Sequence, residues 1–414
     1  MNHIRKTVRQ SSKLRNVLYE IRGPVAARAA EMERSGTDIL KLNIGNPQPF
    51  GFTAPPQITA EMSRTLPVSH GYSDSHGVPA ALDAVIARYS TVAGFPTLRR
   101  EDVYLGNGVS ELITMTCQAL VDNGDEILIP APDYPLWTAM VTLAGGTPVH
   151  YTCEENDGWN PDLADMEARI TGRTTAIVVI NPNNPTGAVY PRHILEGIAD
   201  IARRHSLTLL VDEIYDEITY DGTRHTHLAG VAPDVLALSY SGLSKSSRLA
   251  GYRAGWMVVT GPKDNAADFL HGMELMASTR LCPNVPGQHA VVAALGGGGR
   301  NADHSIAELT GPEGRLARQR DVVDTALNRM DGVRCVTPRG ALYAFPRLDP
   351  GVHDIRDDER LVMDLLEREH ILLVHGTGFN WPTPDHLRIV LLPEEKVLAT
   401  AMERMGNFLS GYRQ

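Results

Sequence analysis

Five short apolar runs between about residues 100 and 262 constrain the fold of this chain more than any other feature. They occupy residues 126–131, 175–180, 207–211, 235–238 and 255–260, and longer amphipathic stretches such as residues 193–204 separate them. Strands that are apolar on both faces suit a sheet that helices cover on both sides, with the amphipathic stretches as crossover helices. The pattern therefore predicts an α/β fold with a large, mostly parallel, mixed sheet.

The C-terminal part has a different pattern. Helical periodicity and short apolar runs alternate there, the first at residues 315–330, 359–369 and 394–409 and the second at residues 340–345 and 386–392. Helices packed on a small sheet make a second, smaller α/β domain, which we expect the N-terminal segment to join. We place the large domain at residues 47–300 and the small domain at residues 1–46 together with 301–414.

The composition limits the classes of partner. A formal charge of −10 disfavours nucleic acid and anionic membranes, because both reward clustered positive charge. The four cysteines lie far apart without paired spacing, which predicts no metal site, no disulfide framework and a reducing compartment. The N-terminus lacks the apolar stretch of a signal peptide, and no apolar run approaches a membrane span. We therefore expect a cytoplasmic protein without a nucleic-acid or membrane partner.

The strongest local signal for chemistry is Lys245, in the segment SGLSKSSRLAGYRAGW at residues 241–256. This lysine follows a predicted strand among small residues, with Arg248 and Arg253 near it in sequence. A lysine beside other cations and partly removed from water loses proton affinity, so its amine can attack a carbonyl and form a Schiff base. The alternative is a solvated loop lysine.

Asp212, in the motif VDEIY, ends a predicted buried strand. In an open parallel sheet, ligands bind beyond the carboxyl ends of the strands, so this carboxylate is expected in the ligand crevice. There it could pair with a protonated pyridine nitrogen and keep the ring an electron sink; the alternative is a helix N-cap. Its neighbour Glu213 is interpreted as a solvated or structural carboxylate. Tyr215 could donate to an oxygen of the same ring or simply pack.

Two further motifs follow predicted strands, and a third begins a predicted helix. Two prolines and a glycine fix the loop NPNNPTG at residues 181–187, so Asn184 could hold its amide for a hydrogen bond, although a plain turn would look the same. The segment GNGVSE opens an apolar helix whose N-terminus could bind a phosphate, unless Ser110 only caps it. Tyr134, in PDYPLW, could stack on a planar ring or belong to the core.

Two arginines complete the candidate site. Arg388 lies in the apolar run HLRIVLL, where a guanidinium removed from water needs an anionic partner. A substrate carboxylate held by two parallel hydrogen bonds would satisfy it, and an internal salt bridge is the alternative. Arg253 could bind a cofactor phosphate.

Taken together and in this order, the motifs resemble the fold-type I pyridoxal-phosphate aminotransferases. The resemblance rests on NPNNPTG, VDEIY, SxxK with GYRAGW, and the arginine of HLRIV. It is strongest to the bacterial glutamate–pyruvate (alanine) aminotransferases, through SSKLRNVLYEIRGP, KLNIGNPQPFGF, PAPDYPLWTA, RLCPNVPGQHA, FNWPTPDH and FLSGY, and it covers nearly the whole chain. It implies the pyridoxal-phosphate transferase fold of type I, pyridoxal 5′-phosphate as cofactor, and amino acids and 2-oxo acids as substrates.

The resemblance also implies a role for each residue around the cofactor ring. Lys245 carries the cofactor as a Schiff base and then moves a proton between the substrate Cα and the cofactor C4′. Asp212 pairs with the pyridine nitrogen, Asn184 and Tyr215 hydrogen-bond the phenolate oxygen, and Tyr134 stacks on the ring.

Further residues are implied to bind the phosphate and the substrate. The phosphate is held by backbone amides and polar side chains, namely Gly108, Val109, Ser110, Ser244 and Arg253. Tyr72 corresponds to a tyrosine that reaches the phosphate from the partner subunit, so the resemblance implies a homodimer. The substrate α-carboxylate is bound by Arg388, Asn184 and the Gly45 backbone, and Tyr19 and Arg22 belong to a segment that closes over the substrate.

Two departures from the family pattern bear on the substrate. Ser246 and Ser247 stand where relatives carry a threonine and an aromatic residue, and no second arginine for a side-chain carboxylate is evident. The second departure favours small or neutral amino donors, so we expect alanine with pyruvate and 2-oxoglutarate, and ping-pong kinetics. The alternatives are a substrate-specialised aminotransferase of secondary metabolism, a pyridoxal-phosphate lyase or oxidase, and a non-catalytic regulator.

Overall fold

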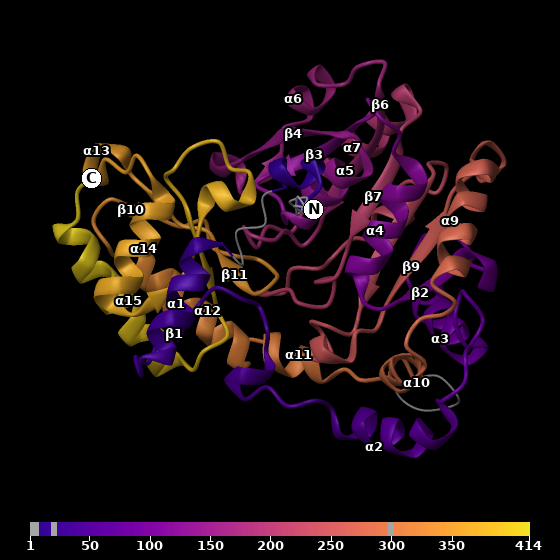
Figure 1. Ribbon diagram of the computed structural model, residues 1–414, viewed down its shortest axis with the longest axis horizontal. Helices are drawn as coiled ribbons and strands as arrows, with labels where there is room; N and C mark the ends of the chain where they lie inside the picture. Colours follow the sequence, from indigo (N-terminus) through magenta and orange to yellow (C-terminus); the bar gives the residue numbers. More distant parts are fainter. Residues whose placement is uncertain (1–7, 18–22, 297–301) are drawn as a thin grey trace, which may run out of the picture.

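The computed structural model describes residues 8–17, 23–296 and 302–414. Figure 1 shows two lobes: a large one built on a twisted sheet, and a smaller one in which the N-terminal helix α1 lies among C-terminal helices. In the part of the chain that the structure describes, no helix is both long enough and apolar enough to cross a membrane.

The large lobe contains an eight-stranded sheet with the strand order β2-β9-β8-β7-β6-β3-β4-β5. Its strands are β2 (Val103–Gly106), β3 (Glu126–Ala131), β4 (Thr147–Glu154), β5 (Asn160–Pro161), β6 (Thr174–Ile180), β7 (Thr208–Asp212), β8 (Ala237–Gly242) and β9 (Gly255–Thr260). The neighbours from β8 to β4 pair in parallel, whereas β9 is antiparallel to β8 and β2, and β5 is antiparallel to β4. The expected mostly parallel, mixed sheet is confirmed.

Successive side chains of the central strands point to opposite faces of the sheet, so the core of the large lobe has two layers. In β6, Ile177 and Val179 pack against helix α7 (Arg192–His205) on one face. Ala176 and Val178 face the opposite layer, which is formed by helices α4 (Val109–Leu120), α5 (Leu136–Ala144) and α9 (Ala267–Thr279). Both faces of the sheet are therefore covered, as period-2 alternation between two helical layers requires.

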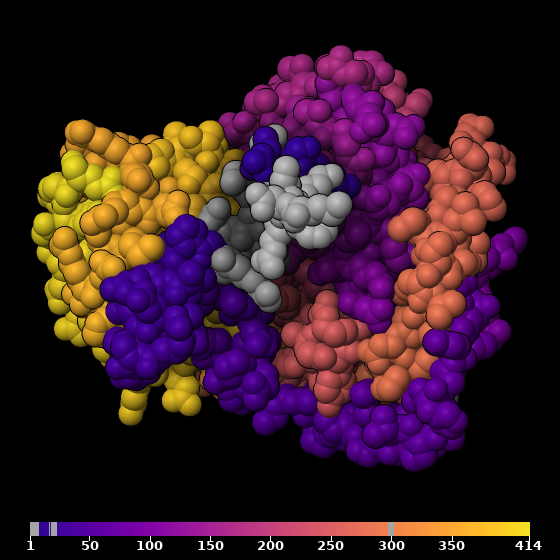
Figure 2. All heavy atoms as spheres, in the orientation of Figure 1, coloured from indigo at the N-terminus to yellow at the C-terminus, as the bar shows by residue number. Residues whose placement is uncertain are grey.

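The small lobe joins the two ends of the described chain. Strand β1 (Leu40–Lys41) pairs in parallel with β13 (Ile371–Leu372). A single apolar core unites four helices, namely α1 (Pro24–Arg34), α12 (Arg315–Leu327), α14 (Asp358–Glu369) and α15 (Glu395–Gly411). Figure 2 shows the indigo N-terminal residues packed against the orange and yellow C-terminal ones. The domain boundaries near residues 46 and 300 stay a prediction.

A three-stranded sheet lies on the side of the small lobe that faces the large one. Its order is β11-β15-β14, with β11 (Tyr343–Ala344), β15 (Leu387–Val390) and β14 (Val374–His375). The strand predicted over residues 340–345 is shorter than expected. Ala341 adopts φ +57, a left-handed conformation that interrupts an extended strand.

Candidate active site

A cavity of about 240 Å³ opens at the carboxyl edge of the large sheet, where β3, β6, β7 and β8 all end. Eleven of the residues singled out in the sequence line it: Gly45, Val109, Ser110, Tyr134, Asn184, Asp212, Tyr215, Ser244, Lys245, Arg253 and Arg388. Gly45 and Arg388 come from the small-lobe side and the others from the large lobe. Ligand crevices of open α/β sheets lie at this edge, so the topology alone brings most of the set together.

Lys245 lies in the turn that follows β8, and its amine reaches into the cavity. Nζ donates a hydrogen bond to the carbonyl oxygen of Gly45 over 2.7 Å and lies 5.7 Å from the centre of the Tyr215 ring. Of the two arginines near it in sequence, Arg253 lines the cavity. The guanidinium of Arg248 points elsewhere and donates to the carbonyl oxygen of Thr53.

Asp212, the last residue of β7, supplies a buried carboxylate to the floor of the cavity. Its oxygens accept hydrogen bonds from Trp137 Nε1 and from the backbone N–H of Ile214, each over 3.3 Å. A turn follows this strand, so the helix N-cap interpretation is wrong. Burial raises the pKa of Asp212 to about 6, because the charged form has lost water and only part of that loss is compensated. A cationic ring nitrogen would supply the missing compensation.

The N-terminus of helix α4 and Arg253 together form a place for an anion. Gly108 caps this twelve-residue helix at φ +84 and no side chain does so, which leaves the first N–H groups open and excludes the capping role of Ser110. A Cβ at Gly108 would overlap Nη2 of Arg253, so only glycine allows the guanidinium to approach the helix end. Arg253 also donates to the carbonyl oxygens of Asn107 and Ala250. Open N–H groups beside a guanidinium suit a phosphate.

Arg388 and Asn184 form the opposite wall. Arg388 is 2% exposed, donates from Nη1 to Asn184 Oδ1 over 3.2 Å, and also hydrogen-bonds the carbonyl oxygen of Asn43. Its guanidinium lies 4.6 Å from the ring centres of both Tyr343 and Phe379, which fixes its orientation by cation–π contact. This arrangement can present a guanidinium edge to a carboxylate.

Tyr343 is a member of the site that the sequence analysis missed. It lines the cavity, and its hydroxyl lies 2.7 Å from that of Tyr215. Burial alone would raise the pKa of Tyr343, but the positive charges of Lys245 and Arg388 outweigh it and the net shift is downward. The tyrosine belongs to the run GALYAF, where a polar aromatic within an apolar strand was the available signal.

Two of the singled-out residues that the structure describes do not line this cavity. Gly108 stands just behind it, under Arg253. Tyr72 is 82% exposed on the surface. Tyr19 and Arg22 lie outside the described residues.

The residues present fit pyridoxal 5′-phosphate. Three groups border one cavity: a buried carboxylate that lacks a compensating cation, an anion site at a helix end, and a lysine amine. These are the groups that a pyridinium nitrogen, a phosphate and an aldehyde require. The large sheet with its helical layers is the fold of the type I pyridoxal-phosphate transferases.

Comparison with known proteins identifies the family. The model of the family "Aminotransferase class I and II" matches residues 37–405. An alanine aminotransferase of Mycobacterium tuberculosis is 62% identical over 98% of this chain and 93% of its own length. The glutamate–pyruvate aminotransferase AlaA of Escherichia coli is 51% identical over 98% and 99%. The chain therefore belongs to the class I and II aminotransferases, whose members depend on pyridoxal 5′-phosphate, and the resemblance seen in the sequence is confirmed.

Solved structures agree with this assignment. The crystal structure of an aminotransferase from Escherichia coli superposes with a TM-score of 0.96 at 51% identity, over 99% of this chain and 100% of that one. The aspartate aminotransferase from Thermus thermophilus with maleate superposes with a TM-score of 0.86 at 29% identity, over 97% and 100%.

Proposed function

We propose that this chain is an alanine aminotransferase that moves an amino group between alanine and 2-oxoglutarate, using pyridoxal 5′-phosphate held at Lys245. The observation that carries the proposal is the convergence of Lys245, Asp212 and Arg388 on one cavity. Relatives named alanine and glutamate–pyruvate aminotransferase, which align over nearly the whole chain, support the choice of substrates.

The cofactor would be held at both of its ends. Asp212 keeps the proton on the ring nitrogen, Tyr134 packs on the ring, and Asn184 and Tyr215 hydrogen-bond its phenolate oxygen. The phosphate is bound by a set of amides and polar side chains, namely Gly108, Val109, Ser110, Ser244 and Arg253. When bound, pyridoxal 5′-phosphate supplies an electron sink for the reacting amino acid.

The protein's own residues orient the substrate and move its proton. Arg388, oriented by Asn184, binds the α-carboxylate by two parallel hydrogen bonds. The amine of Lys245, which reaches into the cavity, would take the proton from the substrate Cα once it is free of the cofactor. Tyr343 lines the small-lobe side of the cavity beside Arg388, whose guanidinium lies 4.6 Å from the centre of its ring.

A homodimer completes this proposal. Tyr72 would bind the phosphate of the partner's site, which agrees with its exposure on this subunit. Leu66 and Val68, before it in the chain, are also exposed, as are Leu275 and Leu281. The two segments meet where Ser75 donates to Glu274, so exposed apolar side chains occur on both of the segments that meet there, as a subunit interface would require.

Half-reactions test the proposal directly. Holoenzyme mixed with alanine alone should release one pyruvate per site while the cofactor absorbance shifts from the aldehyde to the amine form, and 2-oxoglutarate should reverse the shift. The variant Lys245→Ala should do neither. Continuous release of ammonia would overturn the proposal in favour of a lyase or oxidase. A panel of amino donors with 2-oxoglutarate should give alanine the highest kcat/KM, and a larger value for another donor would overturn the choice of substrate.

A further inference from the structure

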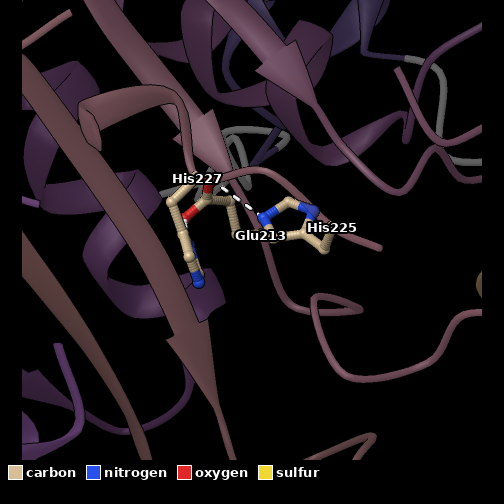
Figure 3. Close-up of side chains that lie close together, drawn as sticks. All are labelled: Glu213, His225 and His227. Carbon is tan, nitrogen blue, oxygen red and sulfur yellow. Dashed lines mark hydrogen bonds and ion pairs between the residues drawn. The ribbon is translucent and has the colours of Figure 1, made fainter. Parts of the chain in front are cut away.

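A second cluster of titratable side chains lies behind the floor of the cavity. Glu213, His225 and His227 turn their polar atoms toward one another (Figure 3). Glu213 follows β7, and its side chain leaves the extended chain on the face opposite to that of Asp212. The two histidines lie just before helix α8 (Leu228–Val231). We propose that this cluster binds a divalent transition-metal ion of the Zn²⁺ type.

The spacing of the three side chains suits one ion. Glu213 Oε1 lies 3.3 Å from His225 Nε2, and Oε2 lies 2.8 Å from His227 Nδ1. The ligand atoms all fall within 4.8 Å of one another, and in the described part of the chain no other such group of three exists. Tetrahedral Zn²⁺ with bonds of about 2.0–2.1 Å holds its ligands roughly 3.3 Å apart, and two histidines with one glutamate is a zinc ligand set that keeps a fourth position open.

The charge on Glu213 calls for a cation. Its side chain is 0% exposed, and among the described residues its ion-pair partners are the two histidines, with no lysine or arginine. The backbone N–H of Leu228 is its other donor. A carboxylate removed from water is costly unless a positive charge balances it. Either a protonated imidazole or a bound metal ion supplies that charge here.

A second cavity gives an ion access to the cluster. This cavity, of about 620 Å³, is lined by His225, His227 and Asp216. Asp216 Oδ1 is buried and has no hydrogen-bond partner in the described part of the chain, although Oδ2 pairs with Arg88. An unpartnered carboxylate oxygen in the wall can hold a water molecule at the open coordination position.

The departure Ser246–Ser247 belongs to this cavity rather than to the cofactor site. Both serines line the second cavity and neither lines the first. Ser247 stands where relatives carry an aromatic residue, so the wall that lines this cavity together with His227 has less bulk at that position. The metal site goes beyond the proposed aminotransferase function and does not depend on it.

Binding changes the tautomers of both rings. Each imidazole must turn a lone pair to the ion, so the proton it gives to Glu213 moves to its other ring nitrogen. On His225 that nitrogen lies 3.5 Å from Asn181 Nδ2, itself a donor, so one weak hydrogen bond is lost. The competing structure is a hydrogen-bonded cluster in which an imidazolium replaces the metal.

Metal-binding measurements on the holoenzyme decide between a metal site and a hydrogen-bonded cluster with an imidazolium. Protein freed of metal by a chelator is titrated with Co²⁺ and, separately, equilibrated with Zn²⁺ before gel filtration. Wild type should develop the visible absorbance of tetrahedral cobalt and retain one Zn²⁺ per chain. The variant His227→Asn should retain less than about a tenth of that ion, because one of three ligands is lost. His227→Asp keeps a ligand at the position and should retain the ion.

The matched control is His304→Asn, which makes the same substitution in the wall of the same cavity at a residue outside the cluster. It should bind Zn²⁺ as wild type does, and Zn²⁺ should raise Tm in both but not in His227→Asn. An ion-free wild type, or undiminished binding by His227→Asn, would overturn the inference. Transamination by the metal-free enzyme is measured in parallel, so the failure of one proposal is distinguishable from the failure of the other.

Discussion

Tyr343 shows at the scale of one residue how the site depends on a contact between the lobes. Its hydroxyl pairs with that of Tyr215 over 2.7 Å, and Tyr215 is proposed to orient the cofactor. In Tyr343→Phe the Tyr215 hydroxyl loses this partner, at a cost of about 1 kcal/mol. We expect kcat/KM for alanine to fall roughly 5- to 10-fold, measured in steady state.

A matched tyrosine separates this effect from a loss of stability. Tyr151→Phe also removes a buried hydrogen bond, from Tyr151 to the carbonyl oxygen of Val178, at residues that do not line the cavity. Both variants should lose a similar free energy of unfolding, and only Tyr343→Phe should lose activity. Equal kcat/KM values in the two variants would exclude a role for the Tyr343 hydroxyl in the site.

Gly45 is a position where a single methyl group should close the cavity. A Cβ there would overlap the hydroxyl of Tyr343, and Gly45 also accepts the hydrogen bond of the Lys245 amine. We expect Gly45→Ala to reduce kcat/KM at least 100-fold, because displacements of about 1 Å at reacting groups have costs of that order. Gly172→Ala, where an added Cβ meets no atom within 4 Å, is the control and should keep full activity.

The sequence predicted the site residues at the ends of strands, but it did not predict site residues that depend on contacts between elements far apart in the chain. Asp212 ends one central strand, Asn184 and Lys245 follow two others, and parallel topology places such positions at one edge. Tyr343 lines the same cavity and Trp137 donates a hydrogen bond to Asp212. The polar aromatic in the run GALYAF was a faint signal for Tyr343, and no local signal marks Trp137. Their partners are fixed only when helix α5 and the small lobe have packed.

At the scale of elements, helix α7 illustrates how burial holds the sheet layers together. Ile198 is fully buried in the layer between this helix and strands β6 and β7. Truncation to alanine leaves a cavity, so Ile198→Ala should lower the free energy of unfolding by about 2–5 kcal/mol in urea denaturation. Glu196→Ala, which breaks an exposed pair with Arg192 on the same helix, should cost less than about 1 kcal/mol. Similar losses in both variants would show that α7 is not anchored by this core.

The contrast between buried and exposed positions also explains which strands could be predicted from the sequence. The strands β3, β6 and β7 are buried on both faces, so they read as continuous apolar runs. The prediction missed β4, which is largely half-exposed and carries polar residues, and the short outer strands β2 and β5. Strand β2 is buried at all four of its positions and β5 has two residues, so in both cases the run is too short to give a clear pattern in the sequence.

At the scale of the whole molecule, Asp133 ties the two lobes together. It lies in the loop after β3, and its backbone N–H donates to the carbonyl oxygen of Phe379, in the segment η10 (Gly376–Phe379). Its carboxyl group accepts hydrogen bonds from Asn380 Nδ2 over 2.7 Å and Thr138 Oγ1 over 2.8 Å. The sequence placed the motifs PDYPLW and FNWPTPDH far apart, and only the fold shows that they meet at this carboxyl group.

Burial gives this contact a pH dependence. Removal from water raises the pKa of Asp133 to about 7 and lowers that of His150, which lies 2.9 Å from Thr138 Oγ1, to about 4. Protonation of Asp133 can reverse its bond with Thr138, so that Asp133 donates to Thr138 and Thr138 donates to the neutral His150. The folded state therefore binds a proton at Asp133 that the unfolded chain releases above about pH 4.

The variant Asp133→Asn should isolate this effect, because its amide imitates the protonated carboxyl group. In wild type the contribution of Asp133 to the free energy of unfolding is complete below about pH 4 and is lost as pH rises through about 7. The asparagine of the variant does not ionise, so its contribution to the free energy of unfolding does not change with pH. His150 is present in both proteins, so its contribution cancels when their stabilities are compared. We therefore expect equal stabilities near pH 4 and a difference in favour of the variant that grows to about 4 kcal/mol by pH 8, measured by urea unfolding. Parallel stability curves would show that Asp133 is ionised in the folded protein, and the connection between the lobes would then be a charged one.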